Sequence, residues 1–267
     1  MAIALLFGLL TTLANVAGSA LAILREHPSR SFMASAIGFS GGFMLAAAFL
    51  EMGPEAISRG AYVPPFIALG FLLLYLTEHL FNVHIHNIPG DHEEVTDGES
   101  SLNSHPNSVG ASPRTLIPAS TGITAYAAFN LHDLIDGLAI GSAMITSQAV
   151  GILVFFAVLL HEVPAGFTVA VMLRSAGKSR IVALLSGVSI GVVTLIGITI
   201  PFLLGDISDT ITGAFLGLAT GSFIYLGASI LIPAAETGGY RWSFLFVAVG
   251  FVAFWVSSAG LGIVISE

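Results

Sequence analysis

The chain has 267 residues, of which 55% are hydrophobic and only 9% are charged, and its mean hydropathy is +0.93. Soluble globular proteins carry about 25% charged residues, so this composition excludes an ordinary water-soluble domain and predicts a polytopic membrane protein. The net charge of −8 leaves no basic surface for nucleic acid, and the lack of cysteine excludes disulfides and thiolate chemistry.

Eight apolar stretches are long enough to cross a bilayer core, which needs about 20 residues per helix. None alternates with the period of two that a barrel strand requires, so an all-α fold is predicted, as one membrane domain of residues 1–267. The first stretch lacks the basic start of a signal peptide and is expected to remain a span. The expected spans are residues 2–24, 31–53, 63–81, 115–145, 150–173, 181–204, 211–235 and 242–265.

The basic residues predict the orientation of these spans. Every Lys and Arg residue except Arg59 lies in a segment that follows an odd-numbered span. Cytoplasmic loops carry an excess of Lys and Arg, so these segments are expected inside the cell. A multi-pass protein of the cell membrane with both termini outside is therefore predicted.

Residues 82–113 form the one long polar stretch, and they are rich in Ser, Asn, Gly and Pro. This composition is typical of a flexible loop, which the orientation predicts to be cytoplasmic. The stretch also contains His84, His86, His92 and His105 among several acids. Two roles are left open for this stretch: weak capture of a transition metal, and a linker that only adds solubility.

Segments 38–56 and 217–235 resemble each other at an offset of 179 residues. Gly42 aligns with Gly221 and Pro54 with Pro233. By the order of the spans, the two segments cross the membrane in opposite directions. This pattern is typical of an inverted repeat in secondary transporters, here of spans 1–3 and 6–8 around the central spans 4 and 5.

The two central spans contain ionisable residues that an apolar helix should avoid. His132, Asp133 and Asp136 lie in the fourth span, and His161 and Glu162 lie in the fifth. Each ionised acid at mid-membrane costs about 2.5–3.5 kcal/mol on insertion scales, and neither span contains Lys or Arg. Imidazole and carboxylate groups suit divalent Zn, Fe or Mn ions, and a dication would offset the charge. All five residues are predicted metal ligands; a His–carboxylate hydrogen-bond network or a proton relay remains the alternative.

These residues resemble the ZIP family of divalent-metal transporters. The fourth helix of that family typically carries His-Asn-x-Pro-Glu-Gly, and the fifth a related motif. Here the fourth span has Asp for Asn, Ile for Pro and Asp for Glu. The residues that match on the fourth span are His132, Asp133, Ile135, Asp136 and Gly137, and those on the fifth are His161, Glu162, Val163 and Pro164. Residues 38–56 also resemble the family's second helix.

The resemblance implies a carrier that moves Zn²⁺ or a related divalent cation into the cytoplasm. The metal is then a substrate and not a cofactor, and the protein is not an enzyme. One departure is Ala165, where the family usually has a liganding Glu or His. Water, Met44 or Glu51 of the second span are left open as replacements, with core packing as the alternative role of Met44. Glu51 and Glu55 are expected near the outer end of that span, as an entry vestibule. The number of metals bound is left open.

The main alternative is an intramembrane metal-dependent hydrolase. His161 and Glu162 match the start of a His-Glu-x-x-His zinc motif, but Ala165 stands where the second His is needed. A proton or anion carrier is a third reading, and the lack of intramembrane Lys or Arg disfavours an anion. The expected partners are a divalent metal ion and the lipid bilayer, with a homodimer left open.

Overall fold

The computed structural model describes residues 1–24, 30–80, 119–237 and 241–265, and the residues described form eight helices without a strand. The predicted all-α fold is therefore confirmed for this part of the chain. Six of the helices are uninterrupted. They are α1 (Ala2–Leu24), α4 (Pro64–Leu80), α5 (Ala119–Thr146), α6 (Gln148–Ser175), α7 (Arg180–Leu204) and α10 (Ser243–Ile265).

The other two helices each pass through a π-helical stretch. Helix α2 (Arg30–Ala47) continues through η1 (Ala48–Met52) into α3 (Gly53–Ser58), and α8 (Asp209–Tyr225) continues through η2 (Leu226–Leu231) into α9 (Ile232–Thr237). A proline at the second position of α3 and of α9 follows each stretch. Because proline has no backbone N–H to continue the α-helical ladder, a local change to i→i+5 hydrogen bonding accompanies it.

Local sequence explains where several helices begin and end. The Ser179 hydroxyl accepts a hydrogen bond from the Val182 amide at the start of α7, and Ser208 does the same for Ile211 at the start of α8. Helix α7 ends at Gly205, whose φ of +89° is readily adopted only by glycine.

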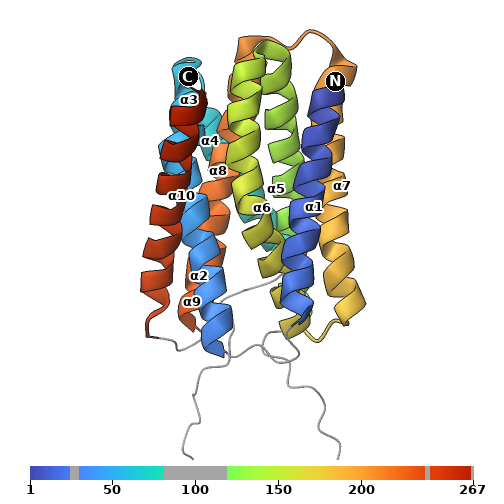
Figure 1. Cartoon of the computed structure of the whole chain (residues 1–267), viewed down its shortest axis with the longest axis vertical. Helices are drawn as coiled ribbons and strands as arrows, with labels where there is room; N and C mark the ends of the chain where they lie inside the picture. Colours follow the sequence, from blue (N-terminus) through green and yellow to red (C-terminus); the bar gives the residue numbers. More distant parts are fainter. Residues whose placement is uncertain (25–29, 81–118, 238–240, 266–267) are drawn as a thin grey trace, which may run out of the picture.

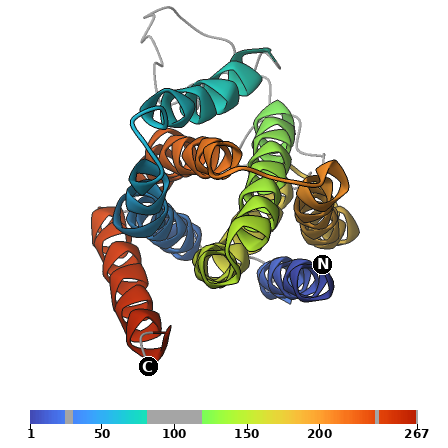
Figure 2. The same ribbon diagram turned by 90° about the horizontal axis from the view of Figure 1, so that it is seen from above.

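The helices pack as two groups, which are visible from above in Figure 2. One group contains α1, α5, α6 and α7. The other contains α2–α3, α4, α8–α9 and α10. The groups meet where α5 packs on α8 and where α2 packs on α6. Helix α1 begins and α10 ends at the same end of the bundle (Figure 1).

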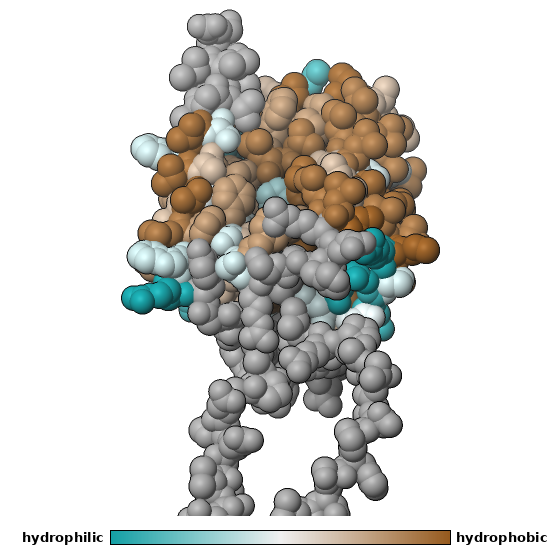
Figure 3. Space-filling model, turned by 60° about the horizontal axis from the view of Figure 1, so that its bottom comes forward, coloured by the Kyte–Doolittle hydropathy of each residue, from teal (hydrophilic) through white to brown (hydrophobic). Residues whose placement is uncertain are grey.

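The outer surface of the bundle suits a lipid environment. Large exposed apolar side chains lie along α1, α4, α7 and α10, and Figure 3 shows a broad apolar side with hydrophilic residues gathered toward one end. Within the described ranges, five helices are long and apolar enough to cross a membrane, and α10 has a shorter apolar stretch at Ser243–Ser258. The predicted loop 82–113 lies outside the described residues.

Candidate metal site

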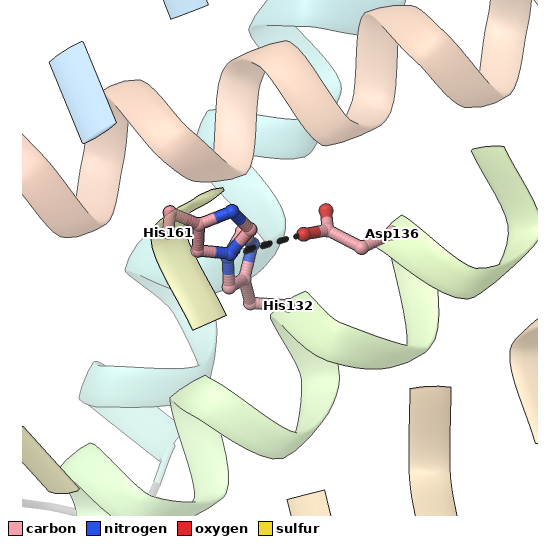
Figure 4. Close-up of side chains that lie close together, drawn as sticks. All are labelled: His132, Asp136 and His161. Atoms are coloured by element: carbon pink, nitrogen blue, oxygen red, sulfur yellow. Dashed lines mark ion pairs between the residues drawn. The ribbon is translucent and has the colours of Figure 1, made fainter. Parts of the chain in front are cut away.

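Three of the predicted ligands meet in the protein interior, where the first helix group faces α8 of the second. His132 and Asp136 belong to α5 and His161 belongs to α6, and all three side chains are fully buried. One carboxylate oxygen of Asp136, Oδ2, lies 3.5 Å from His132 Nε2 and 3.4 Å from His161 Nε2. One ligand atom from each residue lies within 4.8 Å of the other two. Figure 4 shows the three side chains pointing toward one another.

The helical repeat explains why these three residues converge. His132 and Asp136 are four residues apart, so their side chains lie on the same face of α5. Only Ser147 separates α5 from α6, so the two helices are antiparallel neighbours. His161 of α6 therefore faces the pair from α5 across a short distance.

The arrangement leaves polar atoms without hydrogen-bond partners in a buried place. Among the described residues, no partner is found for His132 Nε2, for either Asp136 oxygen or for His161 Nε2. Buried polar groups without partners cost free energy, and native proteins rarely contain several together. Two imidazole nitrogens and a carboxylate are a donor set that Zn²⁺ and related divalent ions accept. These residues can hold one such ion.

Helix α8 of the second group forms a wall against the two histidines. The Phe223 ring contacts both imidazoles edge to face, with its centroid 4.7 Å from that of His132 and 4.5 Å from that of His161. The neighbouring hydroxyl of Ser222 lies 2.9 Å from His132 Nδ1. The sequence analysis missed both residues, because nothing in the sequence says which face of α8 meets α5.

The other two predicted ligands, Asp133 and Glu162, form hydrogen bonds with α7 and α1 and not within the three-residue cluster. Asp133 accepts a hydrogen bond from the Thr194 hydroxyl of α7 at 3.4 Å, and Glu162 accepts one from the Asn15 side-chain amide of α1. Both acids and Asn15 are fully buried. The five predicted ligands therefore lie in two adjacent sets, His132–Asp136–His161 and Asp133–Glu162. The sequence analysis also missed Asn15, although a side-chain amide within a largely apolar span was a sign that could have found it.

Ala165 lies where a fourth ligand could project. It is fully buried on α6, four residues after His161, as Asp136 is four residues after His132. The site consequently has a carboxylate from α5 and none from the matching position of α6.

The two weaker candidates of the second span, Met44 and Glu51, have different surroundings. Glu51 accepts a hydrogen bond from the Ser258 hydroxyl of α10 at 2.6 Å and is not part of the three-residue cluster. Met44 is buried on α2. Glu55 pairs with Arg59 on its own helix at 2.8 Å. Glu51 and Glu55 thus take part in contacts near the C-terminal end of the second predicted span, and their place on the outer side stays a prediction.

Comparison with known proteins finds relatives that match most of the chain. The family profile described as ZIP Zinc transporter matches residues 1–258. The zinc transporter ZupT of Chlorobium luteolum is 28% identical over 256 residues, covering 88% of this chain and 89% of the relative. ZupT of Chlorobium limicola is 29% identical, covering 86% and 88%. Zinc transporter ZIP9 of Xenopus tropicalis is 26% identical, covering 67% of this chain and 54% of the relative. The chain is a member of the ZIP zinc transporter family.

Proposed function

We propose that this multi-pass membrane protein carries Zn²⁺, or a related divalent transition-metal ion, into the cytoplasm through the site of His132, Asp136 and His161. The observation that carries the proposal is the buried cluster of nitrogen and oxygen atoms without hydrogen-bond partners. Ionisable side chains inside a membrane are costly in free energy, and they usually mark a functional site. A bound dication lowers this cost, because it ligates the free atoms and offsets the acidic charge.

The neighbouring acids favour a cation over an anion at this site. Asp133 and Glu162 are buried one residue away from His132 and His161, respectively. No Lys or Arg lies within α5 or on α6 before Arg174 in its last turn. A divalent cation is therefore the substrate that this charge distribution accepts, and the metal passes through the protein as cargo.

Hydrolysis is disfavoured by two features of α6. Ala165 stands at the position of the second histidine of a His-Glu-x-x-His motif. Glu162, which would act as the general base, accepts a hydrogen bond from Asn15 of α1. ZIP proteins are transporters, so the chain is not an enzyme.

All eight helices cross the membrane in this proposal, with α1–α4 related to α7–α10 by an inverted repeat. Close contacts of equivalent glycines support it. A Cβ atom on Gly42 of α2 would lie 1.9 Å from the carbonyl oxygen of Val247 on α10, and one on Gly221 of α8 would lie 1.9 Å from that of Ile67 on α4. Gly42 and Gly221 differ by the offset of 179 that the sequence suggests.

The same relation extends to the central helices. A Cβ atom on Gly18 of α1 would lie 2.1 Å from the Val163 carbonyl oxygen of α6, and one on Gly197 of α7 would lie 2.4 Å from the Leu134 carbonyl oxygen of α5. Gly18 and Gly197 also differ by 179. The repeat therefore exchanges α5 with α6, and it makes Ala165 the counterpart of Asp136.

Alternating access follows from the two helix groups. The ligands lie on α5 and α6 of one group, while Ser222 and Phe223 of α8 close the site from the other. Movement of one group against the other exposes such a site to one side of the membrane at a time. Both termini outside the cell, and assembly as a homodimer, stay predictions from the sequence.

The test is uptake of radioactive Zn²⁺ by proteoliposomes that contain the purified full chain. Uptake should exceed that of empty liposomes, and His132→Ala or Asp136→Ala should nearly abolish it, because each removes a direct ligand. His79→Ala is the matched control, since His79 is exposed on α4 and its Nδ1 contacts a carbonyl oxygen of its own helix. Equal loss in all three variants, or no uptake by the parent, contradicts the proposal.

A further inference from the structure

We propose that Ser222 is a positioning residue for the metal site: its hydroxyl oxygen holds His132 in the tautomer that presents a free nitrogen to the ion. The inference rests on the proposed function, and it adds a residue of the other helix group to the binding machinery. Ser222 lies on α8 and is fully buried.

The hydrogen bonds of Ser222 determine the direction of its contact with His132. Its hydroxyl donates to the carbonyl oxygen of Ala219, one turn earlier in α8, at 2.8 Å. A hydroxyl has a single proton, and a carbonyl oxygen can only accept. The Ser222 oxygen therefore accepts from His132 Nδ1, which lies 2.9 Å away.

This direction sets the protonation of the second ring nitrogen. A neutral imidazole that carries its proton on Nδ1 has a lone pair on Nε2. Nε2 of His132 is the nitrogen that faces Asp136 and has no partner among the described residues. The opposite tautomer would direct an N–H into the site, where a cation must bind. Outer hydrogen bonds of this kind orient metal-binding histidines in many proteins.

No described side chain plays this part for the other histidine of the site, whose ring interacts with the backbone of Ala157 in its own helix. Neither ring nitrogen of His161 has a hydrogen bond from a described side chain. The repeat offset of 179 pairs Ser222 with Phe43 of α2, whose ring cannot accept in this way. Ser222 therefore makes the two halves of the site unequal, and its effect should be confined to His132.

Packing by Phe223 is the competing explanation for the orientation of His132. Its ring contacts both histidines, so shape alone could hold them. The two explanations differ at Ser222→Ala, which removes the acceptor oxygen and leaves Phe223 in place. They also differ at Ser222→Thr, which restores a hydroxyl at the same position.

The experiment measures Zn²⁺ binding by calorimetry on the detergent-purified full chain. Ser222→Ala should weaken binding by about 10- to 100-fold, the range for loss of an outer-shell partner, and Ser222→Thr should restore most of it. Ser186→Ala is the matched control, because Ser186 is also buried and donates to a carbonyl oxygen three residues earlier, on α7. It should bind as the parent does.

A second measurement reads the tautomer without metal. The imidazole ¹⁵N shifts of His132, assigned by their loss in His132→Ala, should indicate a proton on Nδ1 in the parent and a mixture of tautomers in Ser222→Ala. Unchanged shifts and unchanged affinity in a folded Ser222→Ala protein overturn the inference. Failure of the parent itself to bind Zn²⁺ would instead refute the proposed function, and the ¹⁵N shifts would still decide the role of Ser222.

Discussion

The difference between Asp136 and Ala165 is the feature of single residues that most affects the chemistry of the site. Both are buried, both lie four residues after a histidine of the cluster, and only one has a carboxylate. A Zn²⁺ ion held by His132, Asp136 and His161 retains a coordination position for water or another group. The site is therefore expected to bind one ion with room for exchange.

Ala165→Glu should add a carboxylate to this site. We expect Zn²⁺ affinity to rise by about tenfold, equivalent to about 1.4 kcal/mol, and turnover to fall because tighter binding slows release. Calorimetry and proteoliposome uptake measure the two effects. Ala165→Gln is the control, since glutamine is similar in size to glutamate but has no charge. Identical affinity of a well-folded Ala165→Glu and the parent would show that Ala165 does not face the metal.

Uptake should also depend on pH. Metal ligands must be deprotonated to bind, so protons compete with Zn²⁺ at His132, His161 and Asp136. Initial uptake rates are expected to fall as the external pH is lowered from about 8 to about 5, the range in which histidine commonly changes charge. A flat profile at subsaturating Zn²⁺ would argue against the two histidines as direct ligands.

The five predicted ligands lie close together in the structure, but the sequence did not indicate that they divide into two sets. Neighbours in a helix differ by about 100° in direction, so Asp133 cannot share every contact of His132. The helix that Asp133 faces and the helix that His132 faces depend on how α5 packs against its neighbours. That packing cannot be read from the sequence alone. Ser222 was missed because a serine in an apolar helix usually forms its hydrogen bond within its own helix. The sequence also does not show which face of α8 meets α5.

At the scale of elements, glycines determine how closely the helices approach. Small residues allow close packing of helices inside membranes. Gly42 and Gly221 leave no room for a side chain, because a Cβ atom on either would overlap a carbonyl oxygen of the facing helix. The repeated glycines were visible in the sequence, but their partners on α10 and α4 became apparent only in the structure.

Alanine at either of these glycines should therefore separate a helix pair. We expect Gly42→Ala and Gly221→Ala to lower stability by similar amounts, about 1–3 kcal/mol as for other overpacked positions. Gly38→Ala on α2 is the control, since its nearest contact would be 3.3 Å. Thermal unfolding in detergent provides the comparison. Strongly unequal effects at Gly42 and Gly221 would contradict their equivalence in an inverted repeat.

At the scale of the whole molecule, composition alone was enough to predict a helical membrane protein. The predicted spans also agree closely with the helices, since 181–204 corresponds to α7 and 150–173 to most of α6. The π-helical stretches of α2–α3 and α8–α9 were not predicted. They arise from the backbone around two prolines, and proline also ends or bends ordinary helices, so its presence does not specify a π-helix.

The orientation can be tested because the chain has no cysteine. A single cysteine at Lys178, in the turn between α6 and α7, should be protected from an impermeant maleimide applied to intact cells. A cysteine at Asp206, between α7 and α8, should react. These expectations follow from the distribution of Lys and Arg. The reverse pattern would place both termini inside the cell and reverse the proposed direction of uptake.

The proposed transport route depends most directly on where the metal binds. The decisive measurement is anomalous X-ray diffraction at the zinc edge from crystals of the full chain grown with Zn²⁺. We expect a peak between His132 Nε2, His161 Nε2 and the Asp136 carboxylate, and its loss in crystals of His132→Ala. A peak elsewhere with this cluster empty, or a peak that remains unchanged in His132→Ala, would contradict the assignment of the site.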